Sequence, residues 1–558
     1  MSSVEPIGVV SATERNPNTG EEFTFWLAKG IKISPFDIVK VTNSISGEDT
    51  TTYATIEEIY HATDSPGHMS NYISSDFGKI GVDNLTNKLA ITYARATVID
   101  NDDRNYMPVN DGAVVYPADA EDIKKALGQD MIKPEKAIPA GILKTSNGVS
   151  VPIVYSSDFL LGIDGAHLNI SGISGLATKT SYIMFLLKAV QALSEDTAII
   201  VMNVKGDDLL RLHKSGALAE KQKKDWDCFK EHGFELSATP FDNVKYYYPY
   251  MKERNGKRSN TALDNQSLKE QFINDRASNF VYTFEHDKSK LDLLLSNVDD
   301  PNWTIEAILS HIQSHYDFDD DMMNWDKFKI KIKERANSKE SRQSSDSKEL
   351  VAQSWQKFVR LMSTSINNDM FVDSKSEDND LAQVYLSDEV SKISKGDMIV
   401  VDIASLNEQM QCLVFGDVIK TVLDLKQGVT ERTDVPRRIV VFVDELNKYA
   451  PDKTSKNSAI LSNLLEITER GRYSGIILFS AEQFRSAVHD RVTGNCSTHV
   501  YGRTNAIETS KPDYRYIPKS NVSMMTRLDK GDLIIQHPIF KALLKVSFPY
   551  PPYEIPNN

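Results

Sequence analysis

The sequence predicts an α/β protein with a parallel, doubly wound sheet, preceded by a small β-barrel and interrupted by a long helical insertion. From about residue 161, apolar runs of strand length alternate with helical segments. This rhythm is typical of a parallel sheet with helices on both faces. Before residue 100, short segments rich in Val, Ile, Thr and aromatic residues are instead separated by turns, which favours a barrel.

The barrel strands are expected in the first 100 residues. Four segments have strand character: 22–28, 36–43, 51–62 and 89–99. Turn-forming sequences such as NPNTG and SPGH lie between them. Residues 101–160 are interpreted as a connector that contains one helix, near 119–128.

The parallel sheet is expected from six apolar segments. The first strand, at 167–172, precedes a helix at 180–193 whose apolar residues recur at helical spacing. The other strands are predicted at 197–206, 397–404, 437–445, 474–483 and 499–504. Such uninterrupted apolar runs fit strands that are buried on both faces.

The interval 211–390 is predicted as a mostly helical, polar insertion. Amphipathic helices are expected at 302–313 and 349–362, and the low-complexity stretches 338–348 and 373–380 are interpreted as loops. The predicted domains are a barrel with its connector (1–155), the first part of the core (156–210), this insertion, and the second part of the core with C-terminal strands (391–558).

Bulk properties narrow the class of protein. The net charge of −14 argues against DNA binding over the whole surface, although it leaves a local basic channel open. The three cysteines, Cys228, Cys412 and Cys496, are too dispersed for a disulfide framework or a zinc cluster, which fits the cytoplasm. No secretory signal is recognised, and no apolar run reaches the roughly 20 residues that span a bilayer.

The segment GISGLATKT, residues 172–180, has the rhythm of a phosphate-binding loop. The usual pattern is G-x-x-x-x-G-K-[ST], in which backbone N–H groups and the lysine bind phosphate and the hydroxyl binds Mg²⁺. Ile173 and Thr178 stand at its two glycine positions, so the glycines fit a loop one residue longer. The alternative is a plain Gly/Ser-rich turn. The expected nucleotide-binding residues are Gly172, Ser174, Gly175, Ala177, Thr178, Lys179, Thr180 and Ser181.

An acidic pair, Asp444–Glu445, follows the five apolar residues 439–443 of a predicted buried strand. At that place Asp444, together with Thr180, suits Mg²⁺ binding, and Glu445 suits a base that orients the attacking water. The alternative is that the pair caps the N-terminus of the next helix.

Further polar residues follow the later strands. Gln483 comes at the end of the strand at 474–483, where it could sense the γ-phosphate. Arg503 and Arg472 are candidates for an arginine that acts across a subunit boundary on the transferred phosphoryl group. The alternative for either arginine is a surface ion pair.

The order of these motifs resembles the HerA-type ATPases of the HerA/FtsK superfamily. The resemblance implies a RecA-like P-loop NTPase core with an N-terminal HAS-type β-barrel and a helical insertion. It also implies that Gln483 is the sensor, and that Arg503, or else Arg472, is the trans-acting finger. It is carried by the segments 20–41, 51–60, 151–172, 203–208, 398–425, 469–484 and 528–550.

This resemblance implies a hexameric, ATP- and Mg²⁺-dependent DNA translocase or helicase. Its expected partners are DNA, held independently of sequence, and a separate nuclease or sirtuin-like effector, in antiviral defence, with the barrel as docking platform. The phosphate loop departs from the family pattern, but the other site residues are retained, so the loop is interpreted as competent. The alternative is an assembly scaffold that needs no turnover. A membrane-bound coupling ATPase is disfavoured because no transmembrane segment is recognised.

A basic, tyrosine-rich segment at 244–258 admits two interpretations. Its alternating aromatic and cationic residues could stack bases and hold phosphates. The alternative, which we favour, is a strand followed by a basic surface turn.

Overall fold

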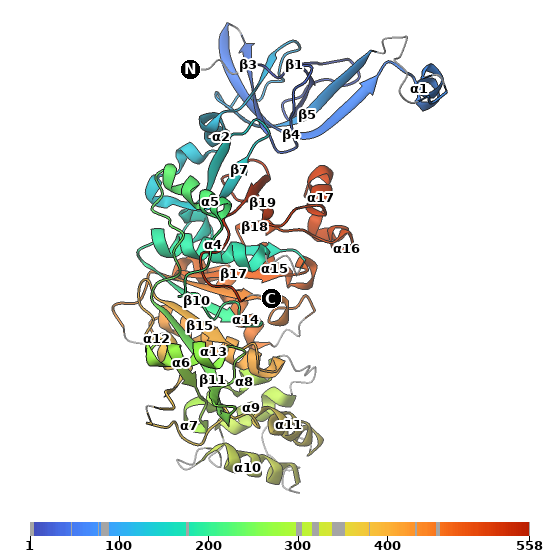
Figure 1. The fold of residues 1–558 in the computed structure, drawn as a ribbon. Coiled ribbons are helices and arrows are strands. Elements are labelled where there is room, and N and C mark those ends of the chain that lie inside the picture. Colours follow the sequence, from blue (N-terminus) through green and yellow to red (C-terminus); the bar gives the residue numbers. More distant parts are fainter. Residues whose placement is uncertain are drawn as a thin grey trace. The chain divides into compact units, whose positions relative to one another are not determined.

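The computed structural model describes residues 5–45, 47–75, 77–79, 89–173, 178–296, 304–314, 318, 323–337, 352–378, 380–429, 432–453 and 458–556. The chain forms two compact units. One contains residues 1–156 and 514–548, and the other contains residues 157–513 and 549–558. Each unit is described by itself (Figure 1).

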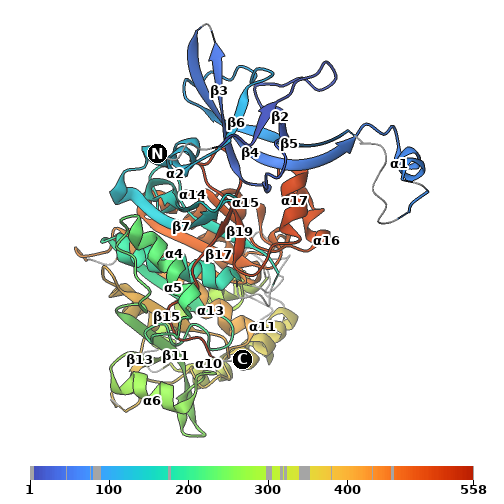
Figure 2. The same ribbon diagram turned by 45° about the horizontal axis from the view of Figure 1, so that its top comes forward.

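The first unit contains a closed antiparallel barrel in the order β1-β2-β5-β4-β3-β6. Its strands are β1 (Gly8–Val10), β2 (Glu22–Leu27), β3 (Ile38–Ile45), β4 (Glu48–Thr63), β5 (Ala90–Asn101) and β6 (Val114–Pro117). Alternate residues of β2, among them Phe23 and Phe25, are buried in the barrel core. The four strands expected from the sequence are confirmed, whereas β1 and β6 were missed because they are very short (Figure 2).

The interval 101–160 is more than a connector with one helix. The helix is present as α2 (Ala120–Ala126), capped by the Asp119 side chain. The interval also contains β6 and a hairpin of β7 (Ala137–Lys144) and β8 (Ser150–Ser156). In the same unit, β19 (Asp532–Gln536) pairs with β20 (Leu544–Ser547), and β20 pairs with β7, all antiparallel. That pairing with the distant C-terminal segment is not visible in the local sequence.

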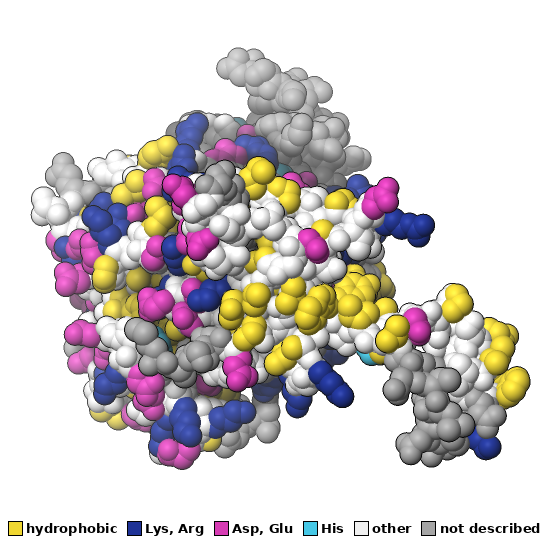
Figure 3. Space-filling view, turned by 90° about the horizontal axis from the view of Figure 1, so that it is seen from above, with side chains coloured by type: hydrophobic (Ala, Val, Ile, Leu, Met, Phe, Trp, Pro, Cys, Tyr) yellow, Lys and Arg dark blue, Asp and Glu magenta, His cyan; other side chains and the backbone are white. Residues whose placement is uncertain are grey.

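The first unit exposes a set of hydrophobic side chains on its long hairpin. Helix α1 (His68–Ser74), between β4 and β5, buries none of its residues. Figure 3 shows hydrophobic side chains in a band that ends at this helix. The exposed residues on α1 and the hairpin include Ile59, Met69, Tyr72, Ile73, Leu89 and Ile91. Helix α17 (Lys519–Met525) completes this unit.

The second unit is built on a parallel sheet in the order β14-β13-β11-β15-β10-β16-β17-β9-β18. The strands expected in the core are confirmed: β9 (Leu168–Ser171), β10 (Thr197–Asn203), β15 (Met398–Asp402), β16 (Arg438–Asp444), β17 (Ile476–Glu482) and β18 (Thr498–Tyr501). Every residue of β10 is buried, and successive residues point to opposite faces, so both faces of the sheet are covered.

The strand register brings several polar residues to one edge. Asn203 pairs with Asp402, Asp444 pairs with Ala481, and Ser171 pairs with both Glu482 and Tyr501. Apart from Ala481, which precedes Glu482 at the end of β17, these are the last residues of parallel strands, so they line the carboxyl edge of the sheet. In open α/β sheets this is the edge where ligands bind.

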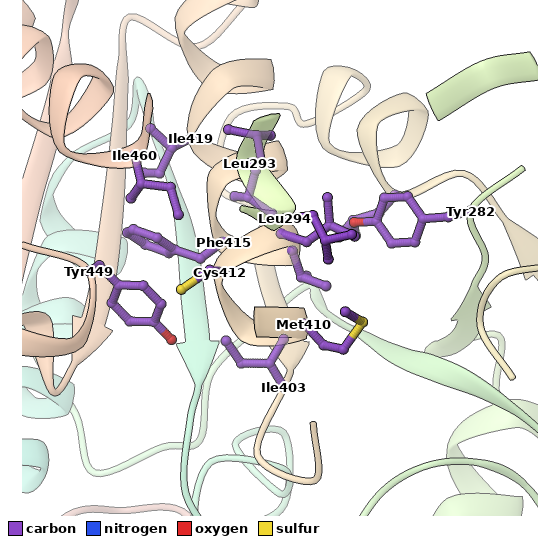
Figure 4. Close-up of a cluster of buried hydrophobic side chains, with 14 of the residues drawn as sticks. Tyr282, Leu293, Leu294, Ile403, Met410, Cys412, Phe415, Ile419, Tyr449 and Ile460 are labelled. Atoms are coloured by element: carbon purple, nitrogen blue, oxygen red, sulfur yellow. The ribbon is translucent and has the colours of Figure 1, made fainter. Parts of the chain in front are cut away.

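Helices pack on the sheet around one large core cluster. Helix α4 (Thr178–Leu193) follows β9, α13 (Glu408–Lys426) follows β15, and α14 (Ala459–Ser474) precedes β17. In Figure 4, Phe415 of α13 points toward Tyr449 and Ile460 on one side of this helix, and Tyr282, Leu293 and Leu294 lie on the other side. These last three residues belong to the insertion, so α13 joins the insertion to the core.

The insertion contributes strands as well as helices. Within 211–390, β11 (Val244–Arg254), β13 (Ala277–Phe280) and β14 (Gln383–Val384) extend the parallel sheet, and β12 (Lys257–Ser259) pairs antiparallel with β11. Residues 373–378 form neither helix nor strand, and the stretch 338–348 lies outside the described residues. The helices are α5 (Glu220–Glu231), α6 (Asn265–Ile273), α7 (Phe284–Asp287), α8 (Leu291–Leu294), α9 (Thr304–Ser314), α10 (Trp325–Asn337), α11 (Ala352–Ser365) and α12 (Leu386–Ser391).

The tyrosine-rich segment is the strand that the sequence favours. Tyr246, Tyr247 and Tyr248 lie in β11 and are at most 3% exposed. Their rings are therefore part of the core and are not available to stack on bases.

In the part of the chain that the structure describes, no helix combines the length and the apolar character needed to cross a membrane.

Candidate functional site

The predicted phosphate loop joins β9 to α4 at the carboxyl edge of the sheet. Gly172 has φ +155°, and a Cβ atom there would lie 3.1 Å from the Arg503 carbonyl oxygen and from the Gly502 Cα. Only glycine fits this close approach to the end of β18. The predicted binding residues Ser174, Gly175 and Ala177 lie outside the described residues. Thr178, Lys179, Thr180 and Ser181 form the first turn of α4.

Lys179 is buried at the N-terminus of α4. It is 7% exposed, and its Nζ donates a hydrogen bond to the Gly172 carbonyl oxygen at 2.5 Å. Burial lowers the pKa of Lys179, while the charge of Asp444 opposes that shift. A desolvated ammonium group beside a helix N-terminus provides two sources of positive potential for an anion.

Asp444 and Glu445 occupy different backbone environments. Asp444 is the last residue of β16 and is 8% exposed. Glu445 adopts the left-handed conformation, with φ 56°, and its N–H donates to Asp444 Oδ1 at 2.8 Å. Its side chain does not cap the single 3₁₀ turn that follows, and α14 is capped by Ser458 instead. Glu445 therefore stands at the N-cap position of this turn, as the helix-cap alternative expects, but its side chain makes no capping hydrogen bond there.

Two lysines hold the Glu445 carboxylate. Lys205 Nζ lies 2.5 Å from Glu445 Oε1, and Lys448 Nζ lies 2.5 Å from Glu445 Oε2. Lys205 is also 3.7 Å from Asp444 Oδ2. Burial by itself raises the pKa of Glu445, but hydrogen bonds and charges from the two lysines outweigh burial and leave this pKa lowered.

A cavity of about 170 Å³ lies at this edge. Lys179 and Thr180 of α4 line it together with Asp444, so residues that are distant in the sequence meet around one space. Lys205 and Asp208, from the turn after β10, line the same cavity, while Met202, Val204 and Leu209 give it an apolar wall. From the sequence, Lys205 and Asp208 are noted only as members of the segment 203–208, and neither residue has a predicted role of its own. The feature that could have identified them is the polar turn that they form at the end of a buried strand.

The end of β17 adds a buried acid and the predicted sensor. Gln483 directly follows β17 and is half-buried. Its neighbour Glu482 is fully buried, and this burial raises the pKa of Glu482 to about 8, against the opposing charges of Arg485 and Lys179. The sequence places Glu482 among the polar residues that end this strand, but it does not predict the raised pKa, because the desolvation of Glu482 depends on the packed sheet.

The two candidate arginines lie at opposite edges of the sheet. Arg503 is exposed and follows β18, and its backbone carbonyl accepts a hydrogen bond from Ile173 N at 2.8 Å, beside the phosphate loop of its own chain. Arg472 is exposed in the last turn of α14, just before β17 begins. It therefore lies at the amino edge, where it packs on the Tyr473 ring at 4.7 Å. The structure does not bring Arg472 to the cavity of the same chain.

The strand order defines the class of fold. β17 lies between β9, which leads into the loop and α4, and β16, which ends in Asp444. β10 lies beyond β16, and β18 lies on the other side of β9. This order, with a strand–loop–helix unit and an acidic residue at the same edge, is that of a RecA-like P-loop NTPase core. The chain thus combines such a core with an N-terminal closed antiparallel barrel and an insertion.

Comparisons with known proteins give distant structural similarity. The bacterial conjugative coupling protein TrwBdeltaN70, in its unbound monoclinic form, aligns with TM-score 0.41 and 11% identity over 77% of this chain and 92% of that one. Plasmid coupling protein TrwB with the ATP analogue ADPNP aligns with TM-score 0.39 and 11% identity over 70% and 87%.

The genome packaging NTPase B204 from Sulfolobus turreted icosahedral virus 2, in complex with ATP-gammaS, aligns with TM-score 0.23 and 14% identity over 30% of this chain and 72% of that one. Similarity at this level carries no argument about what this chain does. No family model matches the sequence, and no curated protein matches it.

Proposed function

We propose that the protein is an ATPase that works as a ring-shaped DNA translocase. The observation that carries this proposal is the cavity shared by Lys179, Thr180 and Asp444 at the N-terminus of α4. It joins a buried cation, a hydroxyl, a carboxylate and a helix N-terminus, which are the groups that a triphosphate and its metal ion need.

The donor set fits Mg²⁺. Thr180 supplies a hydroxyl and Asp444 a carboxylate to the same cavity, and oxygen ligands of this kind suit Mg²⁺ bound jointly with substrate phosphates. When bound, the ion would neutralise charge on the phosphates. Thr180 and Asp444 would hold it, directly or through water.

The chain's other groups would position the reaction. Lys179 and the amides of the loop bind the phosphates of ATP. Glu445 orients the attacking water and accepts its proton, and Gln483 senses the terminal phosphate. The pKa of Glu445, lowered by its two lysines, keeps it ionised at neutral pH.

The arginines suggest how copies cooperate. Arg472 is exposed and remote from the cavity of its own chain, so it would act on the site of a neighbouring copy in a ring, for which we propose six subunits. Arg503 lies beside its own loop and would act there or across the same boundary. An arginine that completes a site in trans makes hydrolysis depend on assembly.

The remaining parts of the proposal rest on the resemblance to HerA-type ATPases. They are that the protein binds DNA through its phosphates, that it works in the cytoplasm, that a nuclease or sirtuin-like effector docks on the barrel, and that the complex acts in antiviral defence. Each follows from that resemblance alone. Binding through phosphates should weaken steeply as salt rises.

ATP turnover with and without DNA tests the proposal. Wild-type protein should hydrolyse ATP faster with DNA, and Lys179→Ala and Glu445→Gln should each abolish turnover, because they remove the phosphate cation and the base. Glu445→Gln should still bind nucleotide. DNA-independent turnover, or turnover that survives both substitutions, would contradict it.

Two observations favour a second candidate function. Glu445 is held by two lysines, and Thr178 replaces the glycine before Lys179, so nucleotide could serve only to hold a ring that organises an effector. In this scaffold, both substitutions would leave activation of the effector intact.

A further inference from the structure

The turn after β10 presents a second cation to the cavity. Lys205 lines it together with Lys179, and its Nζ lies 2.5 Å from Glu445 Oε1. The turn has a defined shape, because Gly206 has φ +52° and Asn203 Nδ2 donates to the Gly206 carbonyl oxygen at 3.0 Å. Asn203 Nδ2 also donates to Asp402 Oδ1 at 2.8 Å. The backbone that carries Lys205 is therefore tied to two strands of the sheet.

Glu445 does not depend on Lys205 alone. Lys448 Nζ holds its other carboxylate oxygen at 2.5 Å, and Lys448 does not line the cavity. If Lys205 turned away, Glu445 would keep one cationic partner. The two lysines thus make the same contact with Glu445 but differ in their access to a ligand.

An anion in the cavity would compete with Glu445 for Lys205. Lys205 is 44% exposed at its side chain, so it can reorient without breaking the core. Its positive charge also opposes that of Lys179, and a polyanion between them would relieve this repulsion. The ammonium group has three N–H donors but a single positive charge, so a phosphate oxygen that contacts Lys205 weakens its attraction to the Glu445 carboxylate.

We propose that Lys205 is a second phosphate-binding residue that exchanges between Glu445 and the terminal phosphate of a nucleoside triphosphate. Binding of the triphosphate thereby withdraws one cation from Glu445 and makes its carboxylate available to water, whereas a diphosphate does not. This inference rests on the proposed function, since it assigns the triphosphate to the same cavity.

Equilibrium binding of fluorescent nucleotides tests this inference without turnover. With Mg²⁺, Lys205→Met should weaken binding of mant-AMPPNP about 10-fold, the usual loss for one charge-assisted contact, and should leave mant-ADP within about 2-fold. Lys205→Arg should keep much of the preference for the triphosphate. The matched control is Lys448→Met, which removes the other contact to Glu445. It should leave mant-ADP affinity unchanged and should weaken mant-AMPPNP binding less than Lys205→Met does, because Lys205 is still present but is then the remaining lysine partner of Glu445.

A double-mutant cycle tests the exchange itself. Glu445→Gln removes the competitor, so it should tighten mant-AMPPNP binding, and this gain should largely vanish in the Lys205→Met background. Equal weakening of both nucleotides by Lys205→Met, an equal effect of Lys448→Met, or an additive cycle would overturn the inference. Unchanged thermal unfolding of each variant shows that folding is not the cause.

Failure of the proposed function would look different. In that case wild-type protein would bind neither nucleotide, or Lys179→Ala would bind both as wild type does. If wild type binds both and Lys179→Ala does not, a negative result with Lys205→Met counts against the exchange alone.

Discussion

Several buried side chains at the carboxyl edge titrate far from their usual range. Burial raises the pKa of Glu482 to about 8 and that of Asp402 to about 6, and it lowers the pKa of Lys179. Each shift disfavours the charged form, because the packed strands exclude water. Such shifts cluster at functional sites, which fits the cavity described above.

Glu482 should make the protein less stable as pH rises. Its folded pKa of about 8 exceeds the ordinary value of 4.5, so the folded state holds a proton that the unfolded chain releases between these values. Stability conferred by that proton is complete below pH 4.5 and is lost progressively toward pH 8. We therefore expect the free energy of unfolding of Glu482→Gln to exceed that of wild type increasingly as pH rises from 4.5 to 8. The difference should grow by about 1.4 kcal/mol per pH unit.

Urea unfolding at pH 5.5 and pH 8 measures this difference. The exposed Glu231 on α5 provides the control, because Glu231→Gln should shift neither midpoint relative to wild type. An equal advantage of Glu482→Gln at both pH values would show that Glu482 is ionised in the folded protein.

Lys179 should lower the stability of the folded protein although it is needed to bind nucleotide. Among the described residues, the Gly172 carbonyl oxygen accepts a hydrogen bond from the buried Lys179 ammonium group, whereas a methionine would keep most of the packed side chain without the charge. The free energy of unfolding of Lys179→Met should therefore equal that of wild type or exceed it by up to about 1 kcal/mol. The variant should also lose nucleotide affinity. Differential scanning calorimetry and mant-nucleotide binding check the two parts. A large loss of stability would indicate a structural role instead.

At the scale of elements, α13 is the junction between the core and the insertion. A Cβ atom on Gly416 would lie 2.9 Å from Leu293 Cδ2 and 3.2 Å from Ile460 Cγ1. The glycine thus lets α8 and α14 approach α13 closely, and the residues around it are buried (Figure 4).

Gly416→Ala should destabilise the second unit although alanine favours helices. Alanine gains up to about 1 kcal/mol in helix propensity, but the added methyl group overpacks a full site, which typically costs about 1–3 kcal/mol. Thermal unfolding measures the balance. In the double variant Gly416→Ala, Leu293→Ala, the truncated leucine makes room for the added methyl group. The double variant should therefore lose less free energy of unfolding than the sum of the losses in the two single variants. Strict additivity would show that the two sites do not meet.

At the scale of the whole molecule, buried and half-buried histidines make the stability of the protein depend on acid. Burial lowers the pKa of His167 and His213 to about 4 and that of His499 and His537 to about 3. The unfolded chain therefore binds protons below about pH 6.5 that the folded protein refuses. Above about pH 6.5 these histidines are neutral in both states and do not reduce stability. As pH falls from about 6.5 toward 4, proton uptake by the unfolded chain lowers the free energy of unfolding.

His537→Gln should weaken this acid sensitivity. Between pH 6.5 and 4, wild type should lose about 1.4 kcal/mol per pH unit more than the variant, which corresponds to one proton. Comparing each variant with wild type cancels the opposite contributions of Glu482 and Asp402. His232, which is exposed, supplies the control variant His232→Gln. Parallel pH profiles for His537→Gln and wild type would contradict the assignment.

Assembly provides the last prediction at this scale. Arg472 lies at the edge of the sheet remote from its own cavity, so a role in hydrolysis requires a second copy. Arg472→Ala and Lys179→Ala should each be inactive alone, and mixing them should restore part of the turnover, because some interfaces then combine an intact cavity with an intact arginine. Full activity of Arg472→Ala would reduce Arg472 to a surface residue.

The sequence by itself determined the core strands, four barrel strands and the helices at the cavity. Their signals are local: apolar runs for strands buried on both faces, and helical spacing for α4. The residues Lys179, Thr180 and Asp444 could be predicted for the same reason, since parallel strands end at one edge. The short strands β1 and β6 were missed, because their stability comes from pairing with other strands of the barrel. The hairpin β7–β8 pairs locally and was missed because it lay in the interval interpreted as a connector.

Only the tertiary structure decided which distant charges meet. Lys205 and Glu445 are paired, Arg472 is at the opposite edge, and Glu482 is desolvated, although nothing in the neighbouring sequence distinguishes these residues. Strand order, rather than order along the chain, sets these distances. The environment of a charge depends on what packs around it, so its ionisation and its partners exist only once the sheet has formed.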